Sequence, residues 1–365
     1  MAASVKLMIQ PGDGVGPLVK AIDAAKSSIE VVIFRLDHGE IERALVNAAQ
    51  RGVFVHALIA FANRGGEKML RKLESRFLAR GISVARTADD LVRYHGKMMI
   101  VDRKKLYLLA FNFTHLDMDH SRSFGLVISA PALVQEAVRL FECDAKRQPY
   151  TPGHPRFLVS PVNARPALAE LIKSARKELL IYDVEVSDRA MLRLLQERQK
   201  AGVAVRVLGW VGARGAGLEA RELDPLRLHT RTVLCDGATV FVGSQSLREL
   251  ELNARREIGV ILRDRNLAQA LTKVFEADWK AARPWAQAPS KAVKEMAKAV
   301  SDKMPSAPAI VDAVQEAIGP KLPVPRKAMT EAVNDAVKEA VKEAVEGAMK
   351  AAAPGEFQAL KLSAL

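Results

Sequence analysis

The chain has 365 residues, of which nearly half are apolar, so its length predicts two domains with sizeable cores and some additional chain. Its formal net charge is +13, nearly all of it before residue 286, which favours phosphate-rich partners: phospholipid headgroups, a membrane surface or nucleic acid. No apolar run approaches the roughly 18 residues that a membrane span requires, and the N-terminus lacks the pattern of a signal peptide. We therefore expect a cytoplasmic protein that is at most peripheral to the membrane.

The first 150 residues alternate between short apolar runs, typical of buried strands, and amphipathic segments, typical of helices. We expect strands at Val5–Ile9, Ile29–Phe34, Val53–Ala60, Ile82–Arg86, Met98–Val101, Leu106–Phe111 and Phe124–Ile128. We expect helices at Leu18–Lys26, Ile41–Gln50, Glu67–Arg80 and Ala130–Lys146, and a polar loop at Thr114–Arg122. Such alternation predicts parallel or mixed sheets flanked by helices.

The same order then begins again, with helices at Ala167–Lys177 and Arg189–Lys200 and strands at Leu179–Val184 and Val203–Trp210. The turn Arg51-Gly52-Val53 recurs 150 residues later as Ala201-Gly202-Val203, whereas His95 recurs only 134 residues later as His229. The second copy therefore lacks about 16 residues, which we assign to the helix and strand around Leu70–Val84. We infer that the chain contains an internal duplication, with repeats at 1–150 and 151–285.

Residues 286–365 differ in character, because they are rich in Ala, Val, Lys and Glu and are interrupted by prolines. Within them, Thr330–Ala352 carries valines at four-residue steps, which predicts an amphipathic helix. We interpret 286–365 as a helical extension that packs on the core or self-associates. Docking to a membrane surface or a protein partner stays open as an alternative.

Two stretches carry the chemistry. His95, Lys97 and Asp102 follow the pattern H-x-K-x4-D, and His229, Arg231 and Asp236 repeat it with the same offsets. Residues two apart on a strand point to the same face, so each histidine should lie beside a phosphate-binding charge. Two such faces brought together would form one phosphodiester-handling site.

This arrangement resembles the tandem motif H-x-K-x4-D-x6-G-S-x-N of the phospholipase D superfamily, and the resemblance covers residues from about 5 to 285. The NFT and SRSFG segments after the first motif are similar to those of cardiolipin-synthase-like bacterial members. The resemblance implies two α/β repeats with one active site at their interface. It also implies a reaction that needs no metal or other cofactor.

In that family one motif histidine attacks phosphorus to form a phosphohistidine, and the other protonates the leaving alcohol and then activates water or an acceptor alcohol. We assign His95 as the nucleophile, since its motif keeps the lysine and asparagine, and His229 as the acid. The reverse assignment stays open, because Glu257 lies 28 residues after His229 and would orient that histidine.

The resemblance also implies how the phosphate is held. Lys97 and Arg231 would neutralise its charge, while hydrogen bonds to its oxygens would come from Asn112, Ser244 and Ser246. Asp102 and Asp236 complete the catalytic set as supporting residues that fix the geometry of each motif.

Each repeat departs from the family pattern. The first has Ala110 in place of the motif serine, and the second has Ser246 in place of asparagine and Arg231 in place of lysine. The offset that leads from His229 to Glu257 leads from His95 to Ser123, so His95 is expected to lack an orienting carboxylate. Three hypotheses follow: a phospholipase D-type phosphodiesterase or phosphatidyltransferase acting on phospholipids, a nuclease of the same superfamily, and a catalytically impaired phosphate- or lipid-binding scaffold.

Overall fold

A computed structural model of the chain describes residues 5–62, 66–215, 217–224 and 226–284, together with 309, 310 and 312. Its internal contacts separate the chain into two units, Met1–Trp285 and Ala286–Leu365. Both expected repeats fall within the first unit. Apart from the helical residues Ala309, Ile310 and Asp312, the extension predicted at 286–365 lies outside the described residues.

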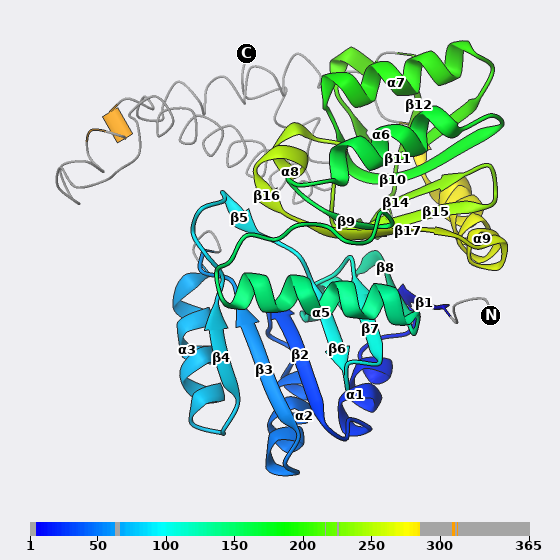
Figure 1. Ribbon diagram of the computed structural model, residues 1–365. Helices are drawn as coiled ribbons and strands as arrows, with labels where there is room; N and C mark the ends of the chain where they lie inside the picture. Colours follow the sequence, from blue (N-terminus) through cyan, green and yellow to red (C-terminus); the bar gives the residue numbers. More distant parts are fainter. Residues whose placement is uncertain are drawn as a thin grey trace, which may run out of the picture. The chain divides into compact units, whose positions relative to one another are not determined.

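The first repeat is built on a mixed sheet with helices on both faces (Figure 1). Its strands run in the order β1 (Val5–Gln10), β8 (Ser121–Ile128), β7 (Lys105–Leu109), β6 (Met98–Val101), β2 (Ser28–Ile33), β3 (Phe54–Ile59) and β4 (Ser83–Arg86). Strands β2, β3 and β4 are parallel, and the other pairs along this path are antiparallel. One face is covered by α1 (Gly16–Asp23), α2 (Gly39–Gln50) and α3 (Glu67–Leu78), and the opposite face by α5 (Pro131–Ala145).

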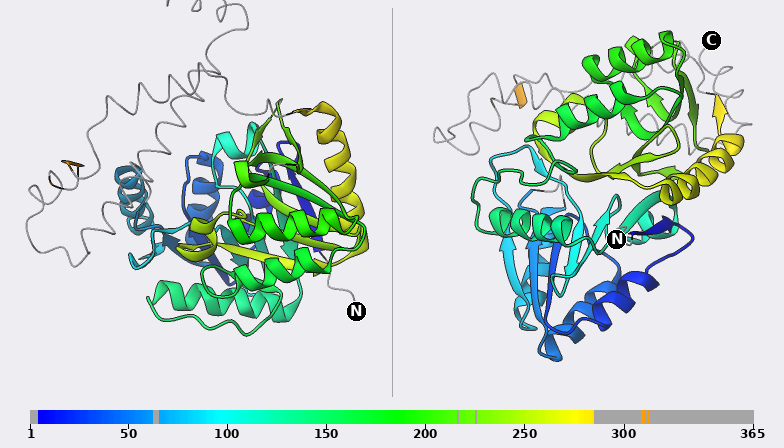
Figure 2. Two further views of the ribbon diagram at one scale, coloured as in Figure 1. Left: turned by 90° about the horizontal axis from the view of Figure 1, so that it is seen from above. Right: turned by 45° about the vertical axis from the view of Figure 1, so that its right-hand side comes forward.

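The second repeat follows the same plan. Its sheet has the order β18 (Arg283–Pro284), β12 (Glu219–Glu222), β11 (Ala204–Val211), β10 (Glu178–Val186), β14 (Arg231–Cys235), β15 (Thr239–Gly243), β17 (Ile258–Arg263) and β9 (Phe157–Val159). Helices α6 (Ala164–Ser174) and α7 (Arg189–Lys200) lie together on one face, as both views of Figure 2 show, and α9 (Arg265–Ala281) covers the other. The α/β fold with two mixed sheets flanked by helices is confirmed.

Two details of the sequence prediction need correction. The second repeat lacks a counterpart of α3, which is replaced by the short 3-10 helix η1 (Ala213–Gly215), but it keeps the strand, since β12 pairs with β11 as β4 pairs with β3. The polar loop at Thr114–Arg122 also contains a helix, α4 (His115–Asp119), because the Thr114 hydroxyl caps the Asp117 N–H. Its counterpart in the second repeat is α8 (Glu249–Asn253).

The two repeats share one hydrophobic core. This core combines buried side chains of both sheets with those of α5 and α9, and α5 contacts β9 while α9 contacts β1. Two short strands also cross between the repeats: β5 (Arg93–Tyr94) pairs with β16 (Arg255–Arg256), and β13 (Arg227–Leu228) pairs with the start of β8. Because β5 and β13 end just before His95 and His229, both motif histidines lie where the repeats meet. Among the described residues, no helix is long and apolar enough to cross a bilayer.

Candidate active site

Each motif histidine is fixed by the backbone of the other repeat. The His95 N–H donates to the Arg256 carbonyl at 2.8 Å, and the His229 N–H donates to the Arg122 carbonyl at 3.0 Å. Both side chains are buried, with 7% and 6% of their residue surface exposed. The duplicated strands therefore bring the two predicted histidines to one interface, held in the same way by pseudo-symmetric contacts.

The carboxylate that orients His95 comes from the second repeat. His95 Nδ1 lies 2.9 Å from Oε2 of Glu257, which is fully buried between β16 and β17. A neutral imidazole that donates from Nδ1 to this carboxylate keeps a lone pair on Nε2, the atom that a nucleophile needs. The prediction that Glu257 orients His229 and that His95 lacks an acid is wrong, because the orienting residue crosses between repeats.

His229 has a different carboxylate as its neighbour. Its Nδ1 lies 3.4 Å from Oδ2 of Asp117, which belongs to α4 of the first repeat. Asp117 is held by the backbone and side-chain N–H groups of Asn112, at 2.8 and 2.7 Å, and by Arg227 at 2.7 Å. Sequence reasoning missed Asp117 because it fell in a predicted loop. The available signal was Glu251, an acid 134 residues later in the matching helix.

The two motif cations occupy matching positions. Lys97 Nζ donates to His95 Nε2 at 2.8 Å and to the His95 carbonyl at 2.7 Å. Arg231 donates to the His229 carbonyl at 3.1 Å and, through Nε, to the Ser246 hydroxyl at 3.0 Å. The larger guanidinium of Arg231 is thus accommodated by the smaller residue, serine in place of the family's asparagine. The two departures from the family pattern compensate for one another.

The electrostatics join the two halves into one site. Burial lowers the pKa of both His95 and His229 well below the usual range, and the charges of Lys97 and Arg231 lower both further, while Asp117 opposes the shift at His229. Burial also lowers the pKa of Lys97 well below its usual range, although Glu257 opposes this. A bound phosphate anion would favour the protonated forms of Lys97 and His229.

The remaining predicted residues support the histidines indirectly. The Ser244 hydroxyl accepts the Ile258 N–H at 3.1 Å, and its hydrogen bond to Glu257 counteracts the rise that burial causes in the pKa of that carboxyl. Asn112 holds Asp117, as described above, and Ser246 holds Arg231. In this structure their contacts position charged groups of the site, whereas the sequence predicted that they bind phosphate directly.

Asp102 and Asp236 stand at hairpin turns, where both have positive φ. Asp102 accepts the N–H groups of Ser27 and Ser28, at 2.7 and 3.1 Å, and Asp236 accepts those of Lys177 and Glu178, at 2.8 and 3.0 Å. They tie each motif hairpin to the strand beside it, which agrees with a supporting role rather than with direct participation in the reaction.

Three charged groups outside the predicted set, of which Asp183 is buried, also belong to the site. Asp183 in β10 accepts the Leu247 N–H at 2.6 Å, and burial raises its pKa to about 7, an effect that Arg231 and a hydrogen bond from Ser246 oppose. Arg93 adds positive charge near His95 and Arg227 near His229. Both arginines stand two residues before a motif histidine, so the repeated pattern R-x-H-x-[KR] was the signal that sequence reasoning overlooked.

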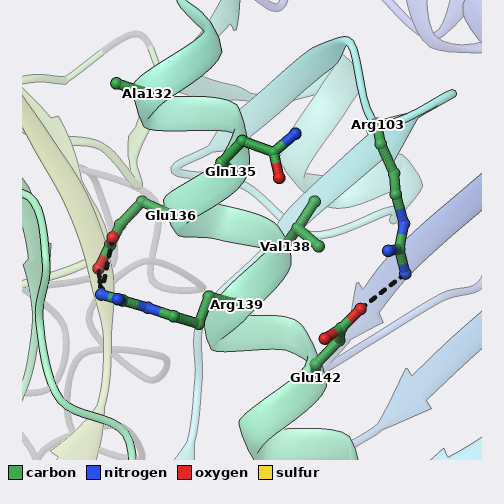
Figure 3. Close-up of a pocket in the computed structure, with 7 residues that line it drawn as sticks. All are labelled: Arg103, Ala132, Gln135, Glu136, Val138, Arg139 and Glu142. Atoms are coloured by element: carbon green, nitrogen blue, oxygen red, sulfur yellow. Dashed lines mark hydrogen bonds and ion pairs between the residues drawn. The ribbon is translucent and has the colours of Figure 1, made fainter.

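A surface hollow along α5 is separate from these residues (Figure 3). Its charged side chains pair with each other, Arg103 with Glu142 at 2.8 Å and Arg139 with Glu136 at 2.6 Å. None of its lining residues belongs to a motif. The candidate active site therefore remains the one around His95 and His229.

The fold also joins three residues for which the sequence suggested no shared role. His38, His115 and Asp119 place one ligand-type atom each within 4.8 Å of the others, and they form the one such group of three among the described residues.

Two histidines, each paired with a carboxylate and a cation across one interface of a duplicated α/β fold, define the class of phospholipase D-like enzymes. A family profile described as cardiolipin synthase, phospholipase D-like domain, matches residues 18–145 and 211–279, more than half of the chain. The chain belongs to this family, within the phospholipase D superfamily.

Known proteins agree with this assignment. The chain is 23% identical to cardiolipin synthase A of Pectobacterium carotovorum, over 74% of this chain and 68% of that protein. The fold is similar to polyphosphate kinase of Porphyromonas gingivalis, with a TM-score of 0.65 and 19% identity over 76% of this chain and 47% of the other. It is also similar to phosphatidylserine synthase of Haemophilus influenzae, with a TM-score of 0.58 and 13% identity over 82% and 94% of the two chains.

Proposed function

We propose that this protein is a phosphodiesterase or phosphatidyltransferase that acts on phospholipids through a phosphohistidine at His95. The observation that carries the proposal is the contact of His95 with Glu257 and Lys97, together with a second histidine, His229, near enough that the charges of Lys97 and Arg231 act on both rings. It supplies an oriented nucleophile, a cation for the phosphate and an acid, which is what a two-step displacement at phosphorus requires.

In the first step, Nε2 of His95 attacks phosphorus and the bond from phosphorus to the leaving oxygen breaks. His229 donates a proton to that oxygen, so the alcohol departs neutral and the phosphorus stays bonded to His95. In the second step, His229 removes a proton from water or from an acceptor alcohol, whose oxygen attacks phosphorus as the phosphorus–nitrogen bond breaks. Both histidines return to their starting state, and the choice of acceptor decides between hydrolysis and transfer.

Side chains supply the positive charge in this proposal. Lys97 already donates to Nε2 of His95, so an incoming phosphate oxygen would replace the imidazole as its acceptor. Arg231 lies at the equivalent position beside His229. Two cations next to the reacting histidines also disfavour a bound metal cation there by charge repulsion, so we propose a metal-independent reaction.

The resemblance to a cardiolipin synthase and the excess of basic residues both support a phospholipid substrate. We also propose that the protein works at the periphery of an anionic membrane, where Lys and Arg side chains near the surface contribute about 1 kcal/mol each. A membrane-docking or partner-docking role for 286–365 belongs to the same proposal.

The test is an assay of the full chain with phosphatidylglycerol vesicles in EDTA, with free headgroup and cardiolipin as the measured products. We expect turnover by the wild type and none by His95→Ala or His229→Ala. Turnover that persists in both variants would contradict the site. A parallel assay with DNA distinguishes the substrate. Cleavage of DNA without lipid turnover would show that the protein is a nuclease. Vesicle binding without turnover would indicate a scaffold.

A further inference from the structure

We propose that His38, His115 and Asp119 form a site for one divalent transition-metal ion of the zinc type, separate from the phosphate site. We call these three residues the His38 cluster. His38 precedes α2, whereas His115 and Asp119 are the first and last residues of α4. An ion bound there would join the two helices.

The backbone already holds the two segments together. The N–H groups of Asp37 and His38 donate to the Phe113 carbonyl at 3.1 and 3.2 Å, and the His115 N–H donates to the Asp37 carboxylate at 2.9 Å. Leu36 and Phe113 form a β-bridge directly before these contacts. The ligand-bearing residues therefore start from fixed backbone positions, which lowers the entropic cost of gathering them around an ion.

The side chains themselves are arranged as ligands. The rings of His38 and His115 stack with centroids 4.1 Å apart, and His115 Nδ1 lies 3.1 Å from Asp119 Oδ2. With zinc-to-ligand distances near 2.0–2.1 Å, neighbouring ligands in a tetrahedral site are about 3.3 Å apart. The ligand atoms lie within 4.8 Å of one another, and His115, whose side chain is 59% exposed, would turn out of its stack with His38 to direct a ring nitrogen at the ion.

A second, independent observation points to a ligand. His38 is only 4% exposed, and its Nδ1 atom is buried without a hydrogen-bond partner among the described residues. Leaving a buried imidazole nitrogen unpaired costs roughly 1–3 kcal/mol in general, so such atoms call for an explanation. A metal ion beside the ring would supply the missing partner.

The surrounding charge favours a cation. The carboxylates of Glu40, Asp119 and Asp37 lie close enough to His38 to contribute negative charge at the cluster. Two imidazoles and a carboxylate suit zinc and its neighbours in the transition series better than calcium or magnesium, which prefer oxygen ligands only. Water would complete the coordination.

The position suggests what the ion would do. Asp117, the neighbour of His229, lies between His115 and Asp119 in the same five-residue helix. An ion that binds both ends of α4 would hold Asp117 in place from the outside. It would not be required for the chemistry, because Asn112 and Arg227 also hold Asp117.

The experiment uses the full chain without an affinity tag, stripped with EDTA, and titrated calorimetrically with ZnCl2. We expect one site per chain and a rise in Tm of several degrees with excess zinc, because the ion binds only the folded state. His115→Ala and Asp119→Asn, which alter exposed positions and should fold normally, should each weaken binding at least about tenfold. His154→Ala, a histidine outside the cluster, should bind zinc as the wild type does.

Absence of zinc binding to the wild type would overturn the proposal, as would equal binding by all variants or loss of binding in His154→Ala as well. The titration contains no substrate. Its outcome is therefore independent of whether the protein turns over phospholipids.

Discussion

The two repeats share a fold but equip their histidines differently. His95 meets a fully buried glutamate at 2.9 Å, whereas His229 meets an aspartate at 3.4 Å that is itself held by two other side chains. Both carboxylates come from the opposite repeat. The comparison teaches that neither repeat contains a site by itself. The repeats have diverged by placing the orienting acid differently, between strands β16 and β17 in one case and in the short helix α4 in the other.

The difference also supports the catalytic roles that we propose for the two histidines. A nucleophile needs a fixed tautomer, and the short contact with Glu257 fixes that of His95. A proton-transferring residue must change its protonation state during the cycle, and the looser contact of His229 with Asp117 tolerates both states. This difference supports our proposal that His95, rather than His229, is the nucleophile.

The largest expected effect comes from removing a histidine. His95→Ala should reduce kcat by a factor on the order of 10⁴ or more with every substrate, because no nucleophile is left. His229→Ala should show a similar loss with natural lipids but a much smaller one in the first step with a nitrophenyl phosphodiester, whose leaving group needs no proton. Burst kinetics measure that step. If both variants lose the same factor in burst rate, His95 and His229 do not have the different roles proposed here.

The orienting acids should rank below the histidines. Glu257→Gln should lower kcat by about 10³-fold, since an amide stabilises neither the tautomer nor the charge that develops on His95. Asp117→Asn should cost only about tenfold, because its contact is longer. Steady-state kinetics on both variants provide the test, with KM expected to stay near that of the wild type. The reverse order would make His229 the nucleophile.

The two cations should differ when exchanged. Arg231→Lys keeps the charge but loses the bond to Ser246, so we expect a loss of about tenfold in kcat/KM. Lys97→Arg should cost more, because Lys97 is 1% exposed and closely surrounded, and the larger guanidinium would displace His95. If the two substitutions lower kcat/KM equally, the hydrogen bond between Arg231 and Ser246 does not contribute to activity.

The smallest effect on activity is expected at the hairpin turns. Asp102→Asn and Asp236→Asn should each lower the free energy of unfolding by roughly 1–2 kcal/mol, as expected for lost charge-assisted hydrogen bonds, and change kcat less than threefold. Burial raises the pKa of Asp102, but the N–H groups of Ser27, Ser28 and Lys26 outweigh it, so the pKa is lowered overall. Its contribution to stability is therefore present above pH 4 and disappears as the pH falls below that value. Urea titrations should show a smaller difference from the wild type at pH 3 than at pH 7.

Much of the fold could be predicted because the strands are continuous apolar runs and the helices are amphipathic. The pairing within each motif also follows from local rules: residues two apart on a strand share a face, so Lys97 lies beside His95 and Arg231 beside His229. The duplication placed both histidines at matching positions.

The partners of the histidines could not be predicted in the same way. Glu257 is close to His229 in sequence but contacts His95, because β5 and β16 pair across the repeats, and nothing local encodes that exchange. Asp117 lies in α4, a five-residue helix too short to show a periodic pattern. His38 and His115 are far apart in the chain, and the contacts of Phe113 and Asp37 bring them together.

The most direct test of the proposed chemistry is to trap the intermediate. His229→Ala is incubated with a nitrophenyl phosphodiester, the reaction is quenched in alkali, and the modified residue is located by mass spectrometry. We predict an adduct on His95, formed in a burst and released slowly because the base for the second step is absent. An adduct on His229 in the His95→Ala variant, or no adduct on His95 despite release of nitrophenol, would contradict the assignment.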